Sequence, residues 1–244
     1  MKYGRERTQP VIDLVSRIEL NTPERIIDIG CGPGNSTAVL AGRWPKSRIT
    51  GLDSSPAMIE RARESGIEAD WITADASTAQ FPGTWDLIFS NAAYQWIPRQ
   101  SELFHKLKAN LKPGGIMAAQ IPLFREMPMS RIIVEVGLQS RWGFSPQNEH
   151  YPTHSREEYY DILSGLFEHV EMWVTSYIHV MESHEAILEM MKSTALKPFL
   201  AQLDHEKERG DYEREILEGI KRDYPARGNN KVLYPFKRLF FIAK

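Results

Sequence analysis

The sequence has 244 residues, which is long enough for one large α/β domain, or for one domain with a substantial insertion, and for a sizeable core. Its net charge of −2 and lack of a long basic run argue against nucleic acid as a partner. Cys31 is the only cysteine, which excludes an intramolecular disulfide, and no amino-terminal apolar stretch indicates a signal peptide or membrane span. We therefore expect a soluble, cytoplasmic protein with no membrane partner; its oligomeric state is open.

The first half of the chain alternates between strand and helix patterns. Apolar residues at helical spacing predict a helix over residues 8–20. Predicted strands cover residues 25–29, 48–53, about 69–74, 85–91 and 116–121; helices are predicted from Ser36 to about Trp44, from Pro56 behind a Ser55 cap, and over 101–111, followed by a turn at 112–115. This alternation predicts a doubly wound, mostly parallel sheet that binds ligands beyond the carboxyl ends of its strands.

The pattern loosens after Ile121, and we expect residues 122–154 to form part of a lid or substrate pocket. Further predicted elements are a helix near 131–139, a helix from a Ser155–Glu158 capping box through Leu163, a strand over 170–180, two or three helices between 183 and about 224 broken at Pro198 and around Gly210, a segment 231–234, and a strand over 238–243. The last two strands should pair antiparallel at the sheet edge, with a helical cap inserted between them. The predicted organisation is one domain, with a core of about 10–121, 155–181 and 231–244, and a lid and cap of about 122–154 and 182–230.

A glycine-rich turn follows the first predicted strand. Glycines at 30, 32 and 34 let the backbone pass close to a ligand, and the helix start at Ser36 offers unpaired N–H groups. The dinucleotide fingerprint G-x-G-x-x-G does not fit, because Asn35 stands where the third glycine should be. The pattern from Asp28 to Gly34 instead resembles motif I of the class I S-adenosylmethionine (SAM) methyltransferases. This resemblance implies a Rossmann-like fold, SAM as cofactor and S-adenosylhomocysteine as product.

Acidic residues end the next two predicted strands. Asp53 follows Gly30 by 53 − 30 = 23 residues, close to the spacing of roughly 20 for a ribose ligand, since one carboxylate can accept both hydroxyl protons; a helix cap is the alternative. The resemblance implies that Asp75 accepts the adenine amino group, with a water-facing loop acid as the alternative. Met58 is expected to pack on one face of the adenine or in the core. Asp28 should accept hydrogen bonds from the loop, or hold the SAM ammonium group through a neighbour. Cys31 is interpreted as a small packing residue rather than a nucleophile.

The segment after the fourth predicted strand should lie near the reacting methyl group. Residues Asn91 to Tyr94 resemble the Asn-Pro-Pro-Tyr signature of amine N-methyltransferases, but alanines replace both prolines and the basic surface for nucleic acid is missing. We reject a nucleic-acid substrate and keep a small amine as a weak alternative. The predicted cofactor-binding residues are Asp28, Gly30, Cys31, Gly32, Gly34, Asn35, Asp53, Ser54, Met58, Asp75, Ala76, Asn91, Ala92 and Trp96.

Further runs resemble the trans-aconitate methyltransferases over almost the whole chain: residues 6–7, 32–37, 49–59, 86–92, 95–96, 159–163, 173–177, 196–199 and 238–240. The resemblance implies methyl transfer from SAM to one carboxylate of a small polycarboxylic acid. That family typically has Met-Pro-Asp-Asn, then Glu-Pro and a Ser-His or Thr-His pair after the fifth strand, whereas residues 121–130 here lack the Asp-Asn and the His. A rebuilt pocket for another small metabolite, with an O- or N-acceptor, and a SAM-binding protein without turnover stay as alternatives.

A carboxylate acceptor needs no general base, because a group with a pKa of about 4 is already an anion at pH 7. We therefore predict positioning and exclusion of water, and no catalytic side chain. His150 and His154 flank Pro152 and are expected to be loop histidines, so no metal site is predicted. Tentative substrate-binding residues are Arg7, Gln95, Trp96, Arg125, Tyr177, His184 and Arg238.

Overall fold

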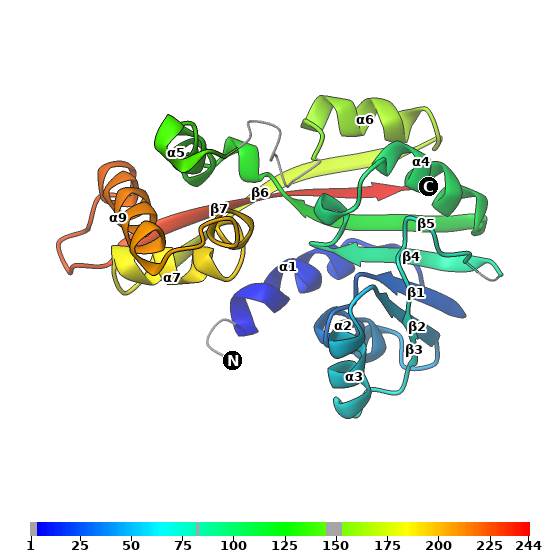
Figure 1. Ribbon diagram of the computed structural model, residues 1–244. Helices are drawn as coiled ribbons and strands as arrows, with labels where there is room; N and C mark the ends of the chain where they lie inside the picture. Colours follow the sequence, from blue (N-terminus) through cyan, green and yellow to red (C-terminus); the bar gives the residue numbers. More distant parts are fainter. Residues whose placement is uncertain (1–3, 82, 145–152) are drawn as a thin grey trace. The chain divides into compact units, whose positions relative to one another are not determined.

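The computed structural model describes residues 4–81, 83–144 and 153–244, with side chains from Thr8 onward (Figure 1). The chain forms two compact units. The first unit contains Met1–Pro122, Tyr151–Val174 and Leu239–Lys244, and the second contains Leu123–His150 and Thr175–Arg238. Among the described helices, none is long and apolar enough to cross a membrane.

Seven strands form one sheet in the order β3-β2-β1-β4-β5-β7-β6. Their bounds are β1 Arg25–Ile29, β2 Arg48–Asp53, β3 Asp70–Thr73, β4 Trp85–Asn91, β5 Leu111–Pro122, β6 Val170–Met181 and β7 Val232–Ala243. The pairs β1–β2, β1–β4, β2–β3 and β4–β5 are all parallel. At the other edge His169 and Lys244 exchange both backbone hydrogen bonds at 2.9 Å, which is the pattern of an antiparallel pair. The predicted Rossmann-like, doubly wound sheet with an antiparallel edge strand is confirmed.

Nine α-helices and three 3₁₀ helices are described. They are α1 Gly4–Ser16, α2 Asn35–Arg43, α3 Pro56–Glu64, η1 Tyr94–Trp96, α4 Gln100–Ala109, η2 Phe124–Glu126, α5 Pro128–Gly137, η3 Ser140–Trp142, α6 Arg156–Ser164, α7 His184–Lys192, α8 Lys197–Leu200 and α9 Glu206–Asp223. Helices α2 and α3 pack on β2, and α4 packs on β5 (Figure 1). Helices α7 to α9 lie in the chain between β6 and β7, so the predicted insertion before the last strand is confirmed.

Several predicted bounds were wrong. The first helix ends at Ser16 rather than Leu20. The N–H groups of Arg17 and Ile18 donate to carbonyls three residues back, which is the 3₁₀ pattern that closes a helix. The predicted turn at 112–115 lies within β5, where a positive φ at Gly114 accommodates a register shift against β4. Gly210 does not break a helix but lies inside α9.

The last strand is longer than predicted, because residues 231–234 and 238–243 belong to one strand, β7. His169 lies opposite Lys244, and the antiparallel register continues from there along both strands. Val170 at the start of β6 therefore lies opposite Ala243 at the end of β7, and Met181 lies opposite Val232. In an antiparallel pair, the backbone groups of every second residue point toward a given neighbouring strand. The backbone groups of Pro235 point away from β6. Its missing N–H therefore costs the β6–β7 ladder nothing.

A buried polar and aromatic contact joins α4 to α6 in the first unit. The Tyr159 hydroxyl donates to Gln100 Oε1 at 2.6 Å, and Gln100 Nε2 donates to the Tyr94 carbonyl at 2.7 Å. The ring of Phe104 lies 6.3 Å from that of Tyr159 and 5.9 Å from that of Phe241. The predicted capping box starts α6, with both the Ser155 and Glu158 hydrogen bonds present.

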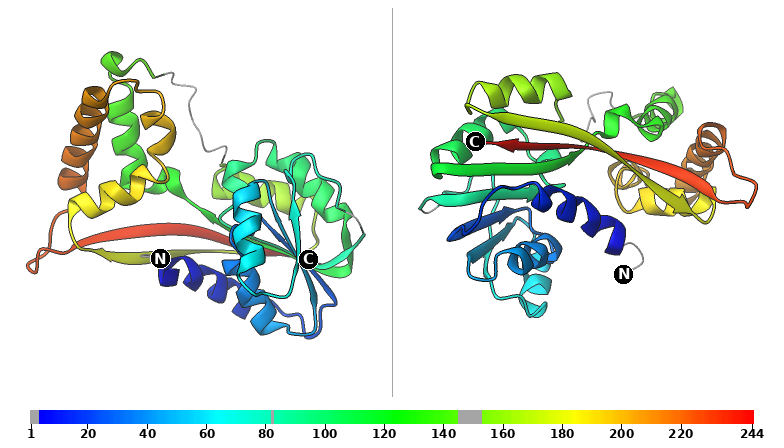
Figure 2. Two further views of the ribbon diagram at one scale, coloured as in Figure 1. Left: turned by 60° about the horizontal axis from the view of Figure 1, so that its bottom comes forward. Right: turned by 180° about the vertical axis from the view of Figure 1, so that it is seen from behind.

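The second unit is organised around the crossing of α5 and α9. A Cβ on Gly219 would lie 2.5 Å from Ile132 Cγ2, so only glycine allows the two helices to approach this closely. Asp223 at the end of α9 accepts from Arg131 of α5 at 2.9 Å and from Arg222 at 2.8 Å, and these arginines lower the pKa of Asp223 to about 2. Around Tyr212 of α9, rings of η3, α8 and Phe144 pack within 5.2 to 6.5 Å. Figure 2 shows α5, α7 and α9 gathered together.

The contact of Gly51 with Trp71 provides a test of packing in the first unit. A Cβ on Gly51 would lie 2.4 Å from the Trp71 ring and 3.0 Å from Cys31 Sγ. We expect Gly51→Ala to lower the free energy of unfolding by about 1–3 kcal/mol through overpacking, measured by urea denaturation. The matched control is Gly42→Ala in α2, where a Cβ meets nothing within 4 Å; it should raise stability by about 0.5–1 kcal/mol. Equal effects of the two alanines would contradict this interpretation.

Candidate cofactor-binding site

The glycine turn between β1 and α2 is fastened to the neighbouring strands. The N–H groups of Gly30 and Cys31 both donate to the Leu52 carbonyl of β2, at 2.7 and 3.1 Å. Gly30 has a φ of +71°, and a Cβ there would lie 2.1 Å from the Ala93 Cβ just beyond β4. Gly34 has a φ of +91° and precedes Asn35, the first residue of α2. Glycine is therefore required where the turn passes the end of β4 and where it enters the helix.

Asp53 at the end of β2 lies directly beside this turn. Its Oδ2 accepts from the Gly32 N–H, and its Oδ1 from the Ser55 N–H, each at 2.9 Å. The prediction that Ser55 caps α3 with its side chain was wrong: Ser55 occupies the N-cap position, but its hydroxyl makes no cap bond, and Asp53 instead takes its backbone N–H. Each carboxylate oxygen can accept a further hydrogen bond, so Asp53 retains the capacity for ribose hydroxyls.

Asp28 is a fully buried carboxyl group on β1. Its Oδ2 accepts from the hydroxyls of Ser36 and Thr37 in the first turn of α2, both at 2.7 Å, so the expected hydrogen bonds are present but come from the helix rather than from the loop. Its Oδ1 has no hydrogen-bond partner among the described residues. Burial raises the pKa of Asp28 to about 6, with the two hydroxyl bonds acting in the opposite direction and the nearby charge of Asp53 adding slightly. The sequence placed Ser36 at the helix start but did not predict that the Ser36 and Thr37 hydroxyls bond to Asp28, although hydroxyl residues shortly after a buried acid are a usable signal.

Cys31 points into the packing beneath the turn. Its side chain is 3% exposed, its N–H bonds Leu52, and its carbonyl accepts from Gly34 at 3.1 Å. Burial and the charges of Asp28 and Asp53 raise the pKa of the thiol, so a reactive thiolate is disfavoured. Cys31 therefore shapes the turn, as the packing interpretation predicted.

Asp75 follows the end of β3, next to β2. The Ala74 N–H donates to the Asp53 carbonyl at 3.0 Å, which ties the two strand ends together. The side chain of Asp75 is exposed, and its Oδ1 accepts from the N–H and hydroxyl of Ser77 at 2.8 and 2.7 Å; these bonds lower its pKa. Ala76 is buried, whereas Met58 in the first turn of α3 is half-buried and Ser54 is exposed.

The segment after β4 is strained and holds buried acceptor atoms. Ala92 has a φ of +54°, a conformation that costs a residue with a Cβ about 1–2 kcal/mol, and its N–H bonds the Gln120 carbonyl at 2.9 Å. Gln95 Nε2 donates to the Ala92 carbonyl at 2.7 Å. Among the described residues, neither Asn91 Oδ1 nor Gln95 Oε1 has a hydrogen-bond partner, although both are buried. Trp96 is 51% exposed. The strain at Ala92 has no signal in the sequence.

Tyr94 is fully buried against Phe104, with ring centroids 5.1 Å apart, and its pKa is raised by burial. The charge of Asp28 also raises this pKa, so the Tyr94 hydroxyl lies close to that carboxyl group.

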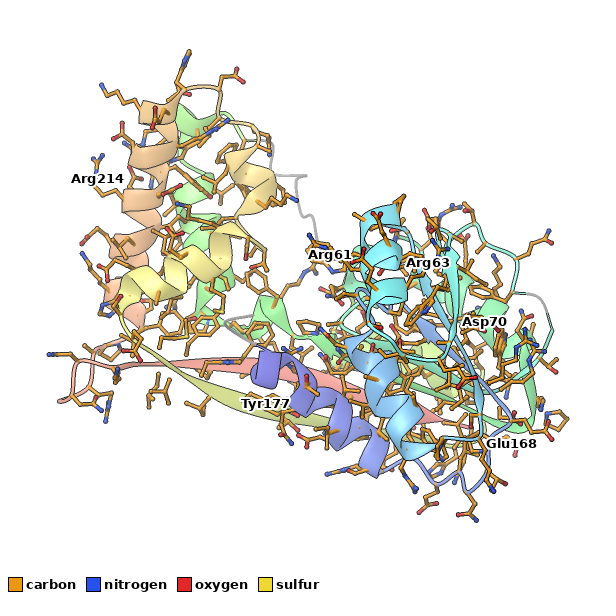
Figure 3. The ribbon with its side chains drawn as sticks, turned by 90° about the horizontal axis from the view of Figure 1, so that it is seen from below. Arg61, Arg63, Asp70, Glu168, Tyr177 and Arg214 are labelled. Carbon is orange, nitrogen blue, oxygen red and sulfur yellow. The ribbon has the colours of Figure 1, made fainter. Side chains whose placement is uncertain are left out.

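The tentative substrate residues fall into both units. Tyr177 of β6, labelled in Figure 3, and Arg238 of β7 come together in the second unit, with the guanidinium 5.9 Å from the Tyr177 ring and 4.5 Å from that of Phe236. Arg238 is only 8% exposed. His184 opens α7, and its Nε2 lies 2.8 Å from the Tyr224 carbonyl. Arg125 lies in η2 of the same unit, whereas the Arg7 side chain lies outside the described residues.

Within the described part of the chain, no group of three His, Cys, Asp or Glu side chains could hold a metal ion. His150 and Pro152 lie outside the described residues. The Nδ1 atom of His154 lies 3.8 Å from Glu158 Oε2.

Structural neighbours share this fold. A putative methyltransferase from Bacillus halodurans superposes with a TM-score of 0.62 at 10% identity, covering 96% of this chain and 97% of its own. Phosphoethanolamine N-methyltransferase 2 from Haemonchus contortus, in complex with phosphomonomethylethanolamine and S-adenosylhomocysteine, gives 0.59 at 19% identity, covering 96% of this chain and 52% of its own. These identities establish the fold alone.

Sequence comparison gives the family. Residues 26–115 match the model of a methyltransferase domain. Trans-aconitate 2-methyltransferases of Escherichia coli (strain K12 / DH10B) and Enterobacter sp. (strain 638) are each 38% identical over 244 residues, covering 100% of this chain and 95% of their own length. The chain therefore belongs to the trans-aconitate 2-methyltransferase family of SAM-dependent methyltransferases.

Proposed function

We propose that the protein transfers the methyl group of SAM to one carboxylate of a small polycarboxylic acid of the trans-aconitate type. The products are a monomethyl ester and S-adenosylhomocysteine. The observation that carries the proposal is the 38% identity over the full chain, because it includes the second unit as well as the glycine turn. A match confined to residues 26–115 would support methyltransferase chemistry without indicating an acceptor.

Buried acceptor oxygens near the ends of β1 and β4 fit a cationic cofactor. Asp28 Oδ1, Asn91 Oδ1 and Gln95 Oε1 have no donor among the described residues. A buried acceptor without a partner is costly, and a ligand that carries donors and positive charge would satisfy it. When bound, SAM supplies a methyl group activated by its sulfonium, together with an ammonium group. With a pKa of about 6, Asp28 is mostly ionised at pH 7 and supplies the opposing charge.

The two strand-end acids complete the proposed cofactor site. Asp53 is held by the Gly32 and Ser55 N–H groups and orients its remaining acceptor capacity toward the ribose hydroxyls. Asp75 is held by Ser77 and accepts the adenine amino group. Both acids bind and orient; neither moves a proton.

The acid substrate needs cationic groups that hold it in place. Arg238 is buried, with its guanidinium 4.5 Å from the ring of Phe236 and 5.9 Å from that of Tyr177, and burial restricts the side chain, which favours bidentate binding of a carboxylate. Arg7, Arg125, His184, Gln95 and Trp96 stay as further candidates. Because the acceptor is already an anion, the side chains position it and exclude water, and no catalytic base is required.

The acceptor class can be tested directly with the purified protein. We expect S-adenosylhomocysteine release with an unsaturated polycarboxylic acid in a panel of small acids and amines, and a methyl ester identified by mass spectrometry. Turnover with an amine only would instead favour the alternative suggested by the altered residues 121–130. SAM binding without turnover on any compound would contradict the proposed activity.

Replacing the Asp28 carboxyl group should raise the stability of the folded protein at pH 7 and lower its affinity for the cofactor. The pKa is raised from 3.8 to about 6, so the folded state holds the proton more tightly; stability is unaffected below about pH 4, falls as the pH rises toward 6, and then levels off. A shift of this size corresponds to about 3 kcal/mol at most. We expect Asp28→Asn to raise the free energy of unfolding at pH 7 by about 1–3 kcal/mol, to change it little at pH 4, and to weaken SAM binding about tenfold or more.

The control for this substitution is Asp86→Asn. Asp86 accepts from the N–H groups of Glu24 and Arg25 and from Lys112, and its pKa is lowered. Its stabilising effect is therefore present at neutral pH and lost on acidification, so Asp86→Asn should destabilise at pH 7. Calorimetric melts and titrations with SAM measure both variants. Destabilisation by both at pH 7 would contradict the role given to Asp28.

Arg238→Met retains an unbranched side chain and removes the charge. We expect kcat/KM for the acid to fall about 10- to 100-fold, mostly through KM, while the Kd for SAM is unchanged, because a charge-assisted pair contributes about 1.5–3 kcal/mol. Lys237→Met removes a charge from the adjacent residue, which pairs with Glu126 at 3.5 Å, and serves as the control. Equal losses in both variants would exclude a specific role for Arg238.

A further inference from the structure

The two edges of the sheet differ in how they are protected. The β3 edge has only four residues and carries Asp70, which pairs with Arg48 at 2.7 Å. The β6 edge has twelve residues, contains no proline, lysine or arginine, and has no acidic residue after Glu171. Edge strands are normally kept short, charged or interrupted to prevent pairing with another chain. The β6 edge lacks these devices.

The hydrogen-bonding direction of β6 shows which groups face this edge. Because His169 and Lys244 exchange both bonds, odd-numbered residues of β6 bond to β7, and even-numbered residues point their N–H and carbonyl groups outward. In the second unit these outward residues are Ser176, Ile178 and Val180. No described segment pairs with this side of β6.

The same residues carry an exposed aliphatic patch. Ile178 is 53% exposed and Val180 61%, and Leu233, which lies opposite Val180 on β7, is 41% exposed. The two strands run side by side as a ribbon (Figure 2). The patch is bordered on one side by the ion pair of Glu182 with Lys231 and on the other by that of Lys237 with Glu126. An exposed apolar patch rimmed by polar residues indicates an interaction surface.

We propose that residues 175–181 of β6 form an interface with a second copy of this chain, whose β6 adds antiparallel to the first. A two-fold axis at Ile178 pairs all seven residues, with Ile178 beside its own copy and Val180 opposite Ser176 of the second copy. Such pairing is self-complementary: it satisfies the outward backbone groups and brings no like charges together, because the segment has no acidic or basic residue other than His179. The charged residues beside the patch form ion pairs, Glu182 with Lys231 and Lys237 with Glu126, so the patch has no net charge that would favour a charged peptide as the partner.

The mass in solution tests this interface. The wild-type chain should sediment as a dimer of 2 × 28.0 = 56 kDa at micromolar concentration and dissociate on dilution. Ser176→Pro removes one outward N–H and spares the β6–β7 ladder, and Ile178→Lys places two like charges together at the axis; each should raise the dimer Kd about tenfold or more. Leu138→Lys is the matched control, since Leu138 is 61% exposed at the C-cap of α5, outside residues 175–181, and its replacement should leave the dimer unchanged.

Hydrogen exchange distinguishes this interface from other modes of association. The amides of Ser176, Ile178 and Val180 should be protected in the wild-type dimer. Those of Ile178 and Val180 should lose protection in both variants, and that of Ser176 in the Ile178→Lys variant. Circular dichroism checks that the variants fold. If the Ser176→Pro variant does not fold, the Ile178→Lys variant alone tests the interface. A wild-type chain that is monomeric throughout the dilution series, or a dimer that Ile178→Lys leaves intact, overturns the proposal.

Discussion

The bonds from Gly30 and Cys31 to the Leu52 carbonyl fix the glycine turn against β2, and the candidate site depends on that attachment. Asp53 repeats the attachment through the Gly32 N–H, and Asp28 ties the other end of the turn to α2. The close approach of Gly30 to Ala93 then sets the turn beside the end of β4. The ends of three adjacent strands, β2, β1 and β4, are thus held together by hydrogen bonds and close packing, as a preorganised binding site requires.

The buried acid in this arrangement opposes folding. Asp28 has only hydroxyl partners for one oxygen and none among the described residues for the other, so its ionisation destabilises the folded protein near neutral pH. The strained φ of Ala92 is a second local cost at the same edge of the sheet. Costs concentrated at the carboxyl ends of β1 and β4 are typical of a functional site, where binding rather than folding satisfies the groups.

Much of the first unit could be predicted from its residues. Strands β1, β2 and β4 follow from apolar runs bounded by polar turn residues, and their predicted bounds are confirmed. Errors arose where tertiary pairing overrides a local breaker. Pro235 and Gly114 look like strand ends, but one bonds away from β6 and the other takes up a register shift. Gly210 stays within α9, where the packed face of the helix outweighs one unfavourable residue.

The sequence by itself indicated the cofactor, because the segment from Asp28 to Gly34 resembles motif I of the SAM methyltransferases and is a local property of one strand-turn-helix unit. It also determined the alternation that yields a parallel sheet. Only the tertiary structure decided which groups are paired: that Ser36 and Thr37 satisfy one oxygen of Asp28, that the Tyr94 ring packs against Phe104, and that Arg238 meets Tyr177 across two strands. These contacts depend on strand register and helix packing between residues distant in sequence, and no local pattern encodes them.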